Sequence, residues 1–112
     1  MPDANQLYDE AEKLKQAGDL EAALAKLEES IAADPKYALA HSAAAVVLQK
    51  LGRHDEAIRH AQQTAELEPS DPFSYTALSV TYQRAYAGTG DTSYIRMAED
   101  AMERSRQLQM GG

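Results

Sequence analysis

Three histidines are the residues of this chain best suited to metal or acid–base chemistry. His54 and His60 are six residues apart, whereas two metal ligands on one face of a helix are usually three or four apart. The chain has no cysteine, which excludes thiolate ligands and disulfide bonds. We therefore expect no metal site and no cofactor.

The carboxylates and serines also lack the setting that catalysis requires. Pairs of acid and base carboxylates need a pocket, but the acidic residues here fall on helix faces that we expect to be exposed: Glu28, Glu29, Glu66, Glu68, Glu99 and Asp100. No serine has the context of a nucleophile elbow. The Gly88–Asp91 segment GTGD follows a predicted helix, and it lacks the GK[ST] ending of a phosphate loop. We expect no catalytic residues and no enzymatic activity.

Charge and hydropathy narrow the possible partners. The net charge is −7, so the chain repels the phosphates of nucleic acid and the surface of anionic membranes. No apolar run approaches the roughly 20 residues of a membrane span, and the first ten residues do not resemble a signal peptide. These features predict a soluble, cytoplasmic protein that binds neither nucleic acid nor membranes.

The chain repeats itself every 34 residues, and the repeated positions are structural. The repeat shows in glycine, alanine and proline as well as leucine, in the pairs Leu14 and Leu48, Gly18 and Gly52, Ala23 and Ala57, and Pro35 and Pro69. A period of 20 to 50 residues is typical of helical arrays. We therefore expect the segments between these positions to be helices.

Each unit is predicted to be a pair of helices. Apolar residues recur at helical spacing from residue 4 to about Gln16, and Gly18 ends that helix. Asp19 caps a second helix, which ends before Pro35. The second unit follows the same plan, with helices at 38–50 and 55–67.

A third unit begins at the expected 34-residue offset and then departs from the repeat. Its turn should fall near Tyr86, but the next strong break is the Gly88–Asp91 cluster, and the following alanine, Ala98, comes seven residues late relative to Ala57. The first helix of this unit is therefore predicted to be about one turn longer, with Asp91 or Thr92 capping the next helix. The 85–95 segment either closes the array or contacts a partner through Tyr86 and Tyr94.

These positions resemble the pattern of the tetratricopeptide repeat, a 34-residue helix–turn–helix with small residues, a Leu-Gly pair and a proline at set offsets. The resemblance rests on Leu7, Ala11, Leu14, Gly18, Ala23, Leu27 and Pro35; on His41, Ala44, Ala45, Leu48, Gly52, Ala57, Ala61 and Pro69; and on Tyr75, Leu78, Ser79 and Tyr82. It implies an all-α solenoid of six helices in one domain, residues 1–112, with repeats at about 4–37, 38–71 and 72–109. His41 replaces the usual large aromatic residue, so we expect it to be packed in the core.

The resemblance also implies a concave face, lined by the first helix of each unit, that binds another protein. By register, this partner-binding face consists of Tyr8, Glu12, Leu39, Ser42, Val46, Gln49, Phe73, Thr76, Val80 and Gln83. The middle of the face is apolar. We therefore expect a non-catalytic adaptor that binds a peptide or helix of a partner protein. The alternative is a self-associating protein or an accessory subunit of a larger complex.

One ligand class of the family is disfavoured. Members that hold the acidic C-terminus of heat-shock chaperones use basic and amide side chains, but the matching positions here are Tyr8, Glu12, Ala43, Phe73 and Ala77. Glu12 would repel a carboxylate. An apolar or mixed segment, carrying a basic residue that meets Glu12 or Asp9, fits this face better.

Overall fold

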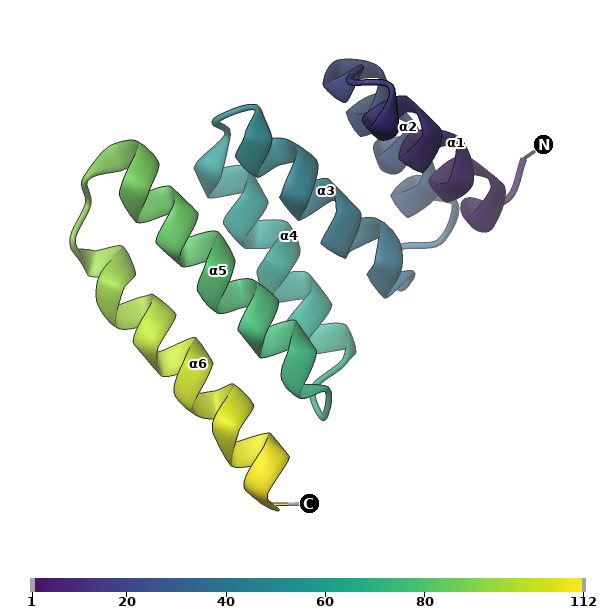
Figure 1. Cartoon of the computed structure of the whole chain (residues 1–112). Coiled ribbons are helices and arrows are strands. Elements are labelled where there is room, and N and C mark those ends of the chain that lie inside the picture. The colour runs from purple at the N-terminus through teal and green to yellow at the C-terminus, as the bar shows by residue number, and fades with distance from the viewer. Residues whose placement is uncertain (1, 112) are drawn as a thin grey trace.

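A computed structural model describes residues 2–111, and in this range the chain forms helices and no strands (Figure 1). The helices are α1 (Ala4–Gln16), α2 (Leu20–Ala33), α3 (Ala38–Lys50), α4 (His54–Leu67), α5 (Pro72–Thr89) and α6 (Ser93–Gly111). They form three successive helix pairs, and each pair packs on the next. The predicted all-α solenoid is confirmed.

The first two pairs turn through the same backbone motif. Gly18 and Gly52 have φ of 86° and 78°, a conformation that side chains with a Cβ rarely adopt. The Asp19 amide donates to the Leu14 carbonyl at 2.9 Å, and the Arg53 amide donates to the Leu48 carbonyl at 2.8 Å. These six-to-one hydrogen bonds define a Schellman cap, which explains why glycine recurs at this offset.

Short polar side chains cap the starts of α2 and α5, and the sequence predicted the cap of α2. The Asp19 carboxylate accepts a hydrogen bond from the Ala22 amide at 3.2 Å, and Asp71 accepts one from the Phe73 amide at 2.9 Å. Each carboxylate satisfies a backbone donor that has no partner within its helix. Helix α4 begins at His54, one residue earlier than predicted, and Arg53 provides no side-chain cap.

Small side chains set the distance between the helices. Of the twenty buried apolar residues in the described part of the chain, twelve are alanine, so the helix backbones can approach closely. Leu24 and Leu27 of α2 pack with Ala44 and Val47 of α3. A second cluster joins α4 to α5 and α6. Helix α3 contributes to both clusters and therefore links the two halves of the core.

The third pair is longer, as predicted, because it has no glycine at the usual turn. Tyr86 occupies the place that Gly18 and Gly52 hold in the earlier units, and its Cβ disfavours a left-handed turn. Helix α5 therefore continues for 18 residues, against 13 in α1 and α3. It stops at Gly90, whose φ is 77°. The predicted break was wrong for Gly88 and Thr89, which form the last residues of α5.

Gly88 lies where α5 contacts the start of α4. A Cβ built on Gly88 would overlap the imidazole of His54, so glycine provides the space that this ring occupies. Nearby, the ring of Tyr94 stacks on Tyr82 at a centroid distance of 6.2 Å. The Tyr94 hydroxyl also donates to Asp55 Oδ1 at 3.2 Å. Gly88 and Tyr94 therefore serve the packing of the lengthened pair.

We predict that Gly88→Ala destabilises the protein, although this change in a helix interior ordinarily stabilises by about 1 kcal/mol. Overlap with His54 should lower the free energy of unfolding by about 1–3 kcal/mol, measured by urea denaturation. Gly111→Ala is the matched control, since a Cβ there meets nothing within 4 Å. The double variant His54→Ala/Gly88→Ala should recover stability relative to Gly88→Ala. A Gly88→Ala protein at least as stable as wild type would contradict this account.

Candidate binding groove

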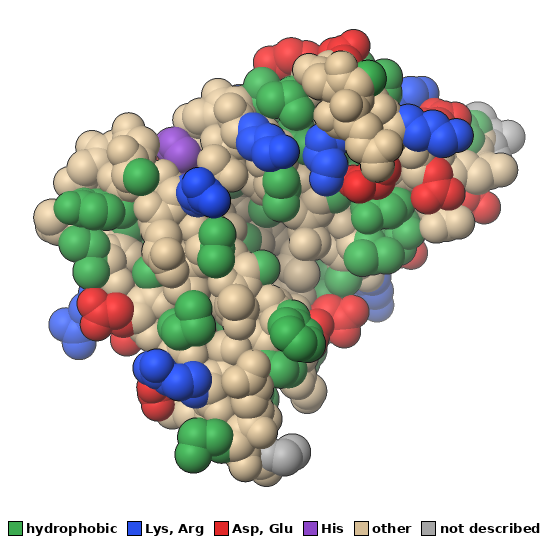
Figure 2. Space-filling model, viewed as in Figure 1, with side chains coloured by type: hydrophobic (Ala, Val, Ile, Leu, Met, Phe, Trp, Pro, Cys, Tyr) green, Lys and Arg blue, Asp and Glu red, His purple; other side chains and the backbone are tan. Residues whose placement is uncertain are grey.

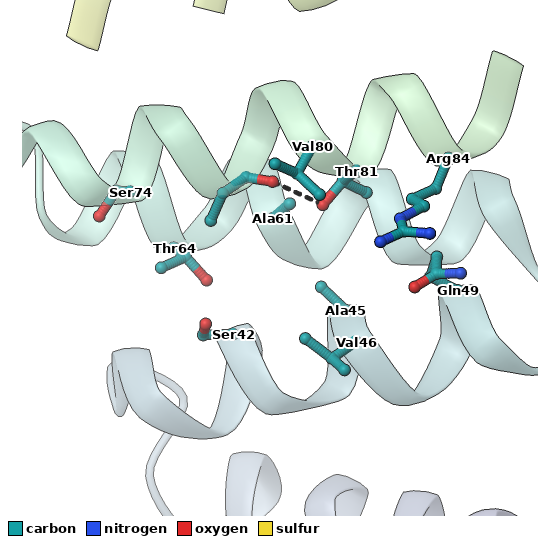
Figure 3. Close-up of a pocket in the computed structure, with 11 residues that line it drawn as sticks. Ser42, Ala45, Val46, Gln49, Ala61, Thr64, Ser74, Val80, Thr81 and Arg84 are labelled. Atoms are coloured by element: carbon teal, nitrogen blue, oxygen red, sulfur yellow. Dashed lines mark hydrogen bonds between the residues drawn. The ribbon is translucent and has the colours of Figure 1, made fainter. Parts of the chain in front are cut away.

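A groove runs between α3 and α5, and α4 forms its floor (Figure 3). The α3 wall carries Ser42, Ala45, Val46 and Gln49, and the α5 wall carries Ser74, Ala77, Val80, Thr81 and Arg84. Ala61 and Thr64 of α4 lie between the walls. This hollow has a volume of about 210 Å³.

A second hollow of about 170 Å³ continues the groove toward the N-terminal ends of α3 and α5. The two share Ser42, Thr64, Ser74 and Ala77 and therefore form one depression. The second hollow adds Ala38, Leu39, Glu68, Asp71 and Phe73. The groove therefore follows α3 over most of its length.

Large apolar side chains along the groove are exposed to solvent. Phe73 is 72% exposed and Leu39 is 55% exposed, while Val46 and Val80 are each 41% exposed. Figure 2 shows apolar side chains spread over this hollowed face, among charged ones. A group of exposed apolar side chains lining a concave surface is typical of a binding site.

The hydroxyl groups of two threonines in the groove already have hydrogen-bond acceptors within the chain. The Thr64 hydroxyl donates to the His60 carbonyl at 3.0 Å, and the Thr81 hydroxyl donates to the Ala77 carbonyl at 2.8 Å. Both hydroxyls are thus satisfied within their own helices. A ligand can cover these side chains without leaving their donors unpaired.

The two ends of the groove carry opposite charges. Arg84 and the Gln49 amide lie near each other at one end (Figure 3). Glu68 and Asp71 line the other end. An occupant therefore meets an acidic end, an apolar middle and a basic end.

The structure divides the ten residues predicted to form the concave face into two sets. Six of them line the groove: Leu39, Ser42, Val46, Gln49, Phe73 and Val80. Thr76 and Gln83 instead turn toward α6. The Thr76 hydroxyl lies 2.8 Å from the Ser105 hydroxyl, and Gln83 lines a separate hollow between α5 and α6.

The two predicted residues of α1 lie apart from this groove. Tyr8 packs edge-on against Tyr37, with ring centroids 5.7 Å apart, and burial raises the pKa of its hydroxyl, with smaller effects from Glu12 and other neighbours. The Glu12 carboxylate pairs with the Lys15 ammonium at 3.4 Å. Both side chains already have partners within the chain.

Sequence reasoning missed the floor of the groove and its basic end. Ala61 and Thr64 belong to the second helix of their unit, whereas the family resemblance predicts that the first helix of each unit lines the concave face. Arg84 lies one residue after the predicted Gln83, and it follows Val80 by four positions. Residues three and four positions apart can both share one face of a helix. Spacing from Val80 therefore could not distinguish Arg84 from Gln83 as the residue that lines the groove.

A pair of histidines joins α3 to α4 outside the groove. His41 is 3% exposed, which confirms the prediction that it is packed in the core. Its Nε2 lies 2.9 Å from the Pro35 carbonyl, so Nε2–H donates and Nδ1 is left as an acceptor in the neutral ring. The His60 Nδ1 lies 3.0 Å from this acceptor and donates to it. The sequence analysis considered the spacing between His60 and His54, but the structure pairs His60 with His41.

Burial lowers the pKa of His60, and the neighbouring His41 and Arg59 lower it further, while Glu56 opposes them. The ring also borders a shallow hollow with Glu28, Arg53 and Glu56. Within residues 2–111, no three His, Cys, Asp or Glu side chains are grouped so that they could hold a metal ion. No helix in the same range combines the length and apolar character that a membrane span requires.

Comparison with known proteins identifies relatives in fold. The tetratricopeptide repeat family model matches residues 14–79, which is more than half of the chain. No curated protein matches at a significant level. A crystal structure of MamA has a TM-score of 0.81 over 97% of this chain at 22% identity, and this chain covers 60% of MamA. MamA 41-end from Desulfovibrio magneticus RS-1 gives a TM-score of 0.74 over 94% of this chain at 21% identity, with 55% of that chain covered.

A third solved structure matches this chain nearly end to end. The second TPR of Spaghetti (RPAP3), bound to the HSP90 peptide SRMEEVD, has a TM-score of 0.77 at 22% identity. The match covers 94% of this chain and 91% of the other. This chain thus spans about three fifths of MamA and almost all of the single repeat domain.

The histidine pair predicts a pH dependence of stability. The unfolded chain restores the ordinary pKa of His60, about 6.5, so below that pH the unfolded state binds more protons than the folded state. The free energy of unfolding should therefore fall as the pH drops from about 7.5 to about 5.5. His60→Gln should reduce this fall, because glutamine can still donate to His41 and does not titrate. Urea denaturation at the two pH values tests this, and equal falls in both proteins would refute it.

Proposed function

Because the chain belongs to the tetratricopeptide repeat family, we propose that it is a non-catalytic adaptor. It binds a segment of another protein in the groove between α3 and α5. The observation that carries this proposal is the row of exposed apolar side chains along one continuous depression, Leu39, Val46, Phe73 and Val80. Covering them would remove apolar surface from water, which is the main favourable term in protein association.

The dimensions of the groove favour a short extended segment. From Leu39 to Gln49, α3 rises by about 15 Å, at about 1.5 Å per residue. An extended peptide covers this distance with about four or five residues, at about 3.3–3.6 Å each. Apolar side chains on this segment would occupy the middle of the groove.

The charged ends favour one orientation of the segment. A basic residue of the ligand fits beside Glu68 and Asp71, and an acidic residue or a C-terminal carboxylate fits beside Arg84 and Gln49. The sequence had suggested Glu12 or Asp9 as the acidic contact, but Glu12 is paired with Lys15 and neither residue lines the groove. We therefore place the acidic contact at Glu68 and Asp71.

This ligand differs from the acidic peptide bound by the second TPR of Spaghetti. The family resemblance assigns five positions to the basic clamp that holds an acidic peptide. None of the five is basic in this chain, and Ala43 at one of them is buried. Arg84 is the single cation among the residues of the two hollows in the described chain. A ligand with several carboxylates would therefore lack counter-charges.

We predict that a peptide selected from a random display library against the purified protein will depend on the groove. Val46→Ala/Phe73→Ala should weaken its binding at least tenfold, because each truncation removes roughly 1 kcal/mol or more of apolar contact. Fluorescence anisotropy with the labelled peptide measures the loss. Met97→Ala is the control, since Met97 is exposed and lies outside the groove. Equal binding by the groove variant and wild type would refute the site.

We also predict that Glu68→Lys reverses the preference at the acidic end. Peptides selected against this variant should lose the basic residue that wild type selects there, because like charges repel. Glu66→Lys makes the same change in charge at an exposed position outside the groove. It should leave the selected consensus unchanged. A Glu68→Lys protein that still selects a basic residue would contradict the proposed orientation.

A further inference from the structure

The last helix pair presents a further hollow, separate from the groove between α3 and α5, which the proposed function does not use. It lies between α5 and α6 at the edge of the stack opposite α1 (Figure 1), and its volume is about 510 Å³. Residues from both helices line it, namely Ser79, Gln83 and Tyr86 with Ile95, Ala98, Glu99, Met102 and Arg106. We call this surface the terminal groove.

The terminal groove corresponds to the surface that receives a helix in the earlier units. Helix α3 packs on α2, and α5 packs on α4. The receiving residues are Leu24, Leu27 and Ile31 in α2, and Ile58, Ala61 and Ala65 in α4. With the seven-residue delay of the third unit, the matching positions in α6 are Glu99, Met102 and Arg106. The surface thus keeps the place of a helix-binding site but carries charges in two of its three positions.

These charges would complement a second copy of the same helix. Ile95, Glu99, Met102 and Arg106 are spaced by four, three and four residues, so they share one face of α6. In an antiparallel pair of α6 helices with the two-fold axis between Met102 and Glu103, Glu99 lies opposite Arg106 of the partner copy. The same register sets Ile95 opposite Met110, which is 87% exposed. A two-fold contact must be self-complementary, and this face meets that condition in both charge and apolar contact.

We propose that the protein forms an antiparallel homodimer through the α6 helices and the terminal groove. In this dimer two symmetric Glu99–Arg106 pairs flank a centre formed by Met102. Arg106 bonds Glu103 at 2.7 Å in the single chain, where both side chains are mostly exposed. Such an exposed ion pair contributes little to the stability of the single chain. Arg106 can therefore turn to the partner's Glu99 with little loss of free energy. Tyr86, which is 39% exposed, borders the same contact.

Charge reversal tests this arrangement by sedimentation equilibrium, across about 1 µM to 1 mM, the range of a small transient interface. Wild type should dimerise, whereas Glu99→Arg and Arg106→Glu should each raise the dissociation constant at least about tenfold, since each places like charges in contact. The double variant Glu99→Arg/Arg106→Glu should restore the dimer. An equimolar mixture of the two single variants should form a heterodimer, because every pair is then opposite in sign.

Asp100→Arg is the matched control, since it makes the same change in charge on another face of α6 and should leave the dimer intact. Circular dichroism should show that all variants keep their helices, because the changed side chains are exposed. A wild type that stays monomeric at all concentrations would overturn the proposal. Single variants that dimerise as tightly as wild type would also overturn it. Neither result bears on peptide binding between α3 and α5.

Discussion

Close approach between helix backbones is the constraint on which this structure depends. A chain with one phenylalanine and no tryptophan has few large side chains with which to fill gaps, so its helices must meet through alanine. Ala11, Ala23 and Ala57 are almost fully buried. Glycine meets the same need at the turns, where Gly18 and Gly52 reverse the chain within three residues. Spacing these small residues 34 apart gives each unit the same geometry and stacks the pairs in one direction.

The groove follows from this stacking. When α5 packs on α4 and α4 packs on α3, α3 and α5 also contact each other, but a depression remains between them over α4. Side chains such as Val46 and Val80 then have no helix to cover them. The apolar surface is thus produced by regular packing. The charged ends come from Glu68 and Arg84, and the equivalent residues one repeat earlier, Asp34 and Lys50, carry the same charges.

The fold could be predicted from the sequence because its signals are local. Proline, glycine and helical spacing predicted the starts of α1, α2 and α3 and placed the start of α4 one residue late, and the missing glycine at Tyr86 indicated the longer α5. The site was harder to predict, because lining a groove depends on contacts between units. Thr76 and Val80 share helix α5, but Thr76 turns toward Ser105. The contact between His41 and His60 joins residues 19 apart on different helices, and no spacing rule within one helix can reveal it.

The lengthened third pair has a consequence for how this chain can vary. The delay between Ala57 and Ala98 exceeds the repeat by seven residues, which is close to two helical turns. Five of the seven extra residues lengthen α5 at its C-terminal end and two lengthen α6 at its N-terminal end, so the contacts at the base of the hairpin keep their phase. The Ser79 hydroxyl, for example, donates a hydrogen bond to the Ala98 carbonyl at 2.7 Å. A change of nearly two turns in the combined length of the two helices is thus absorbed at the tip of the hairpin, while the contacts nearer its base stay in place.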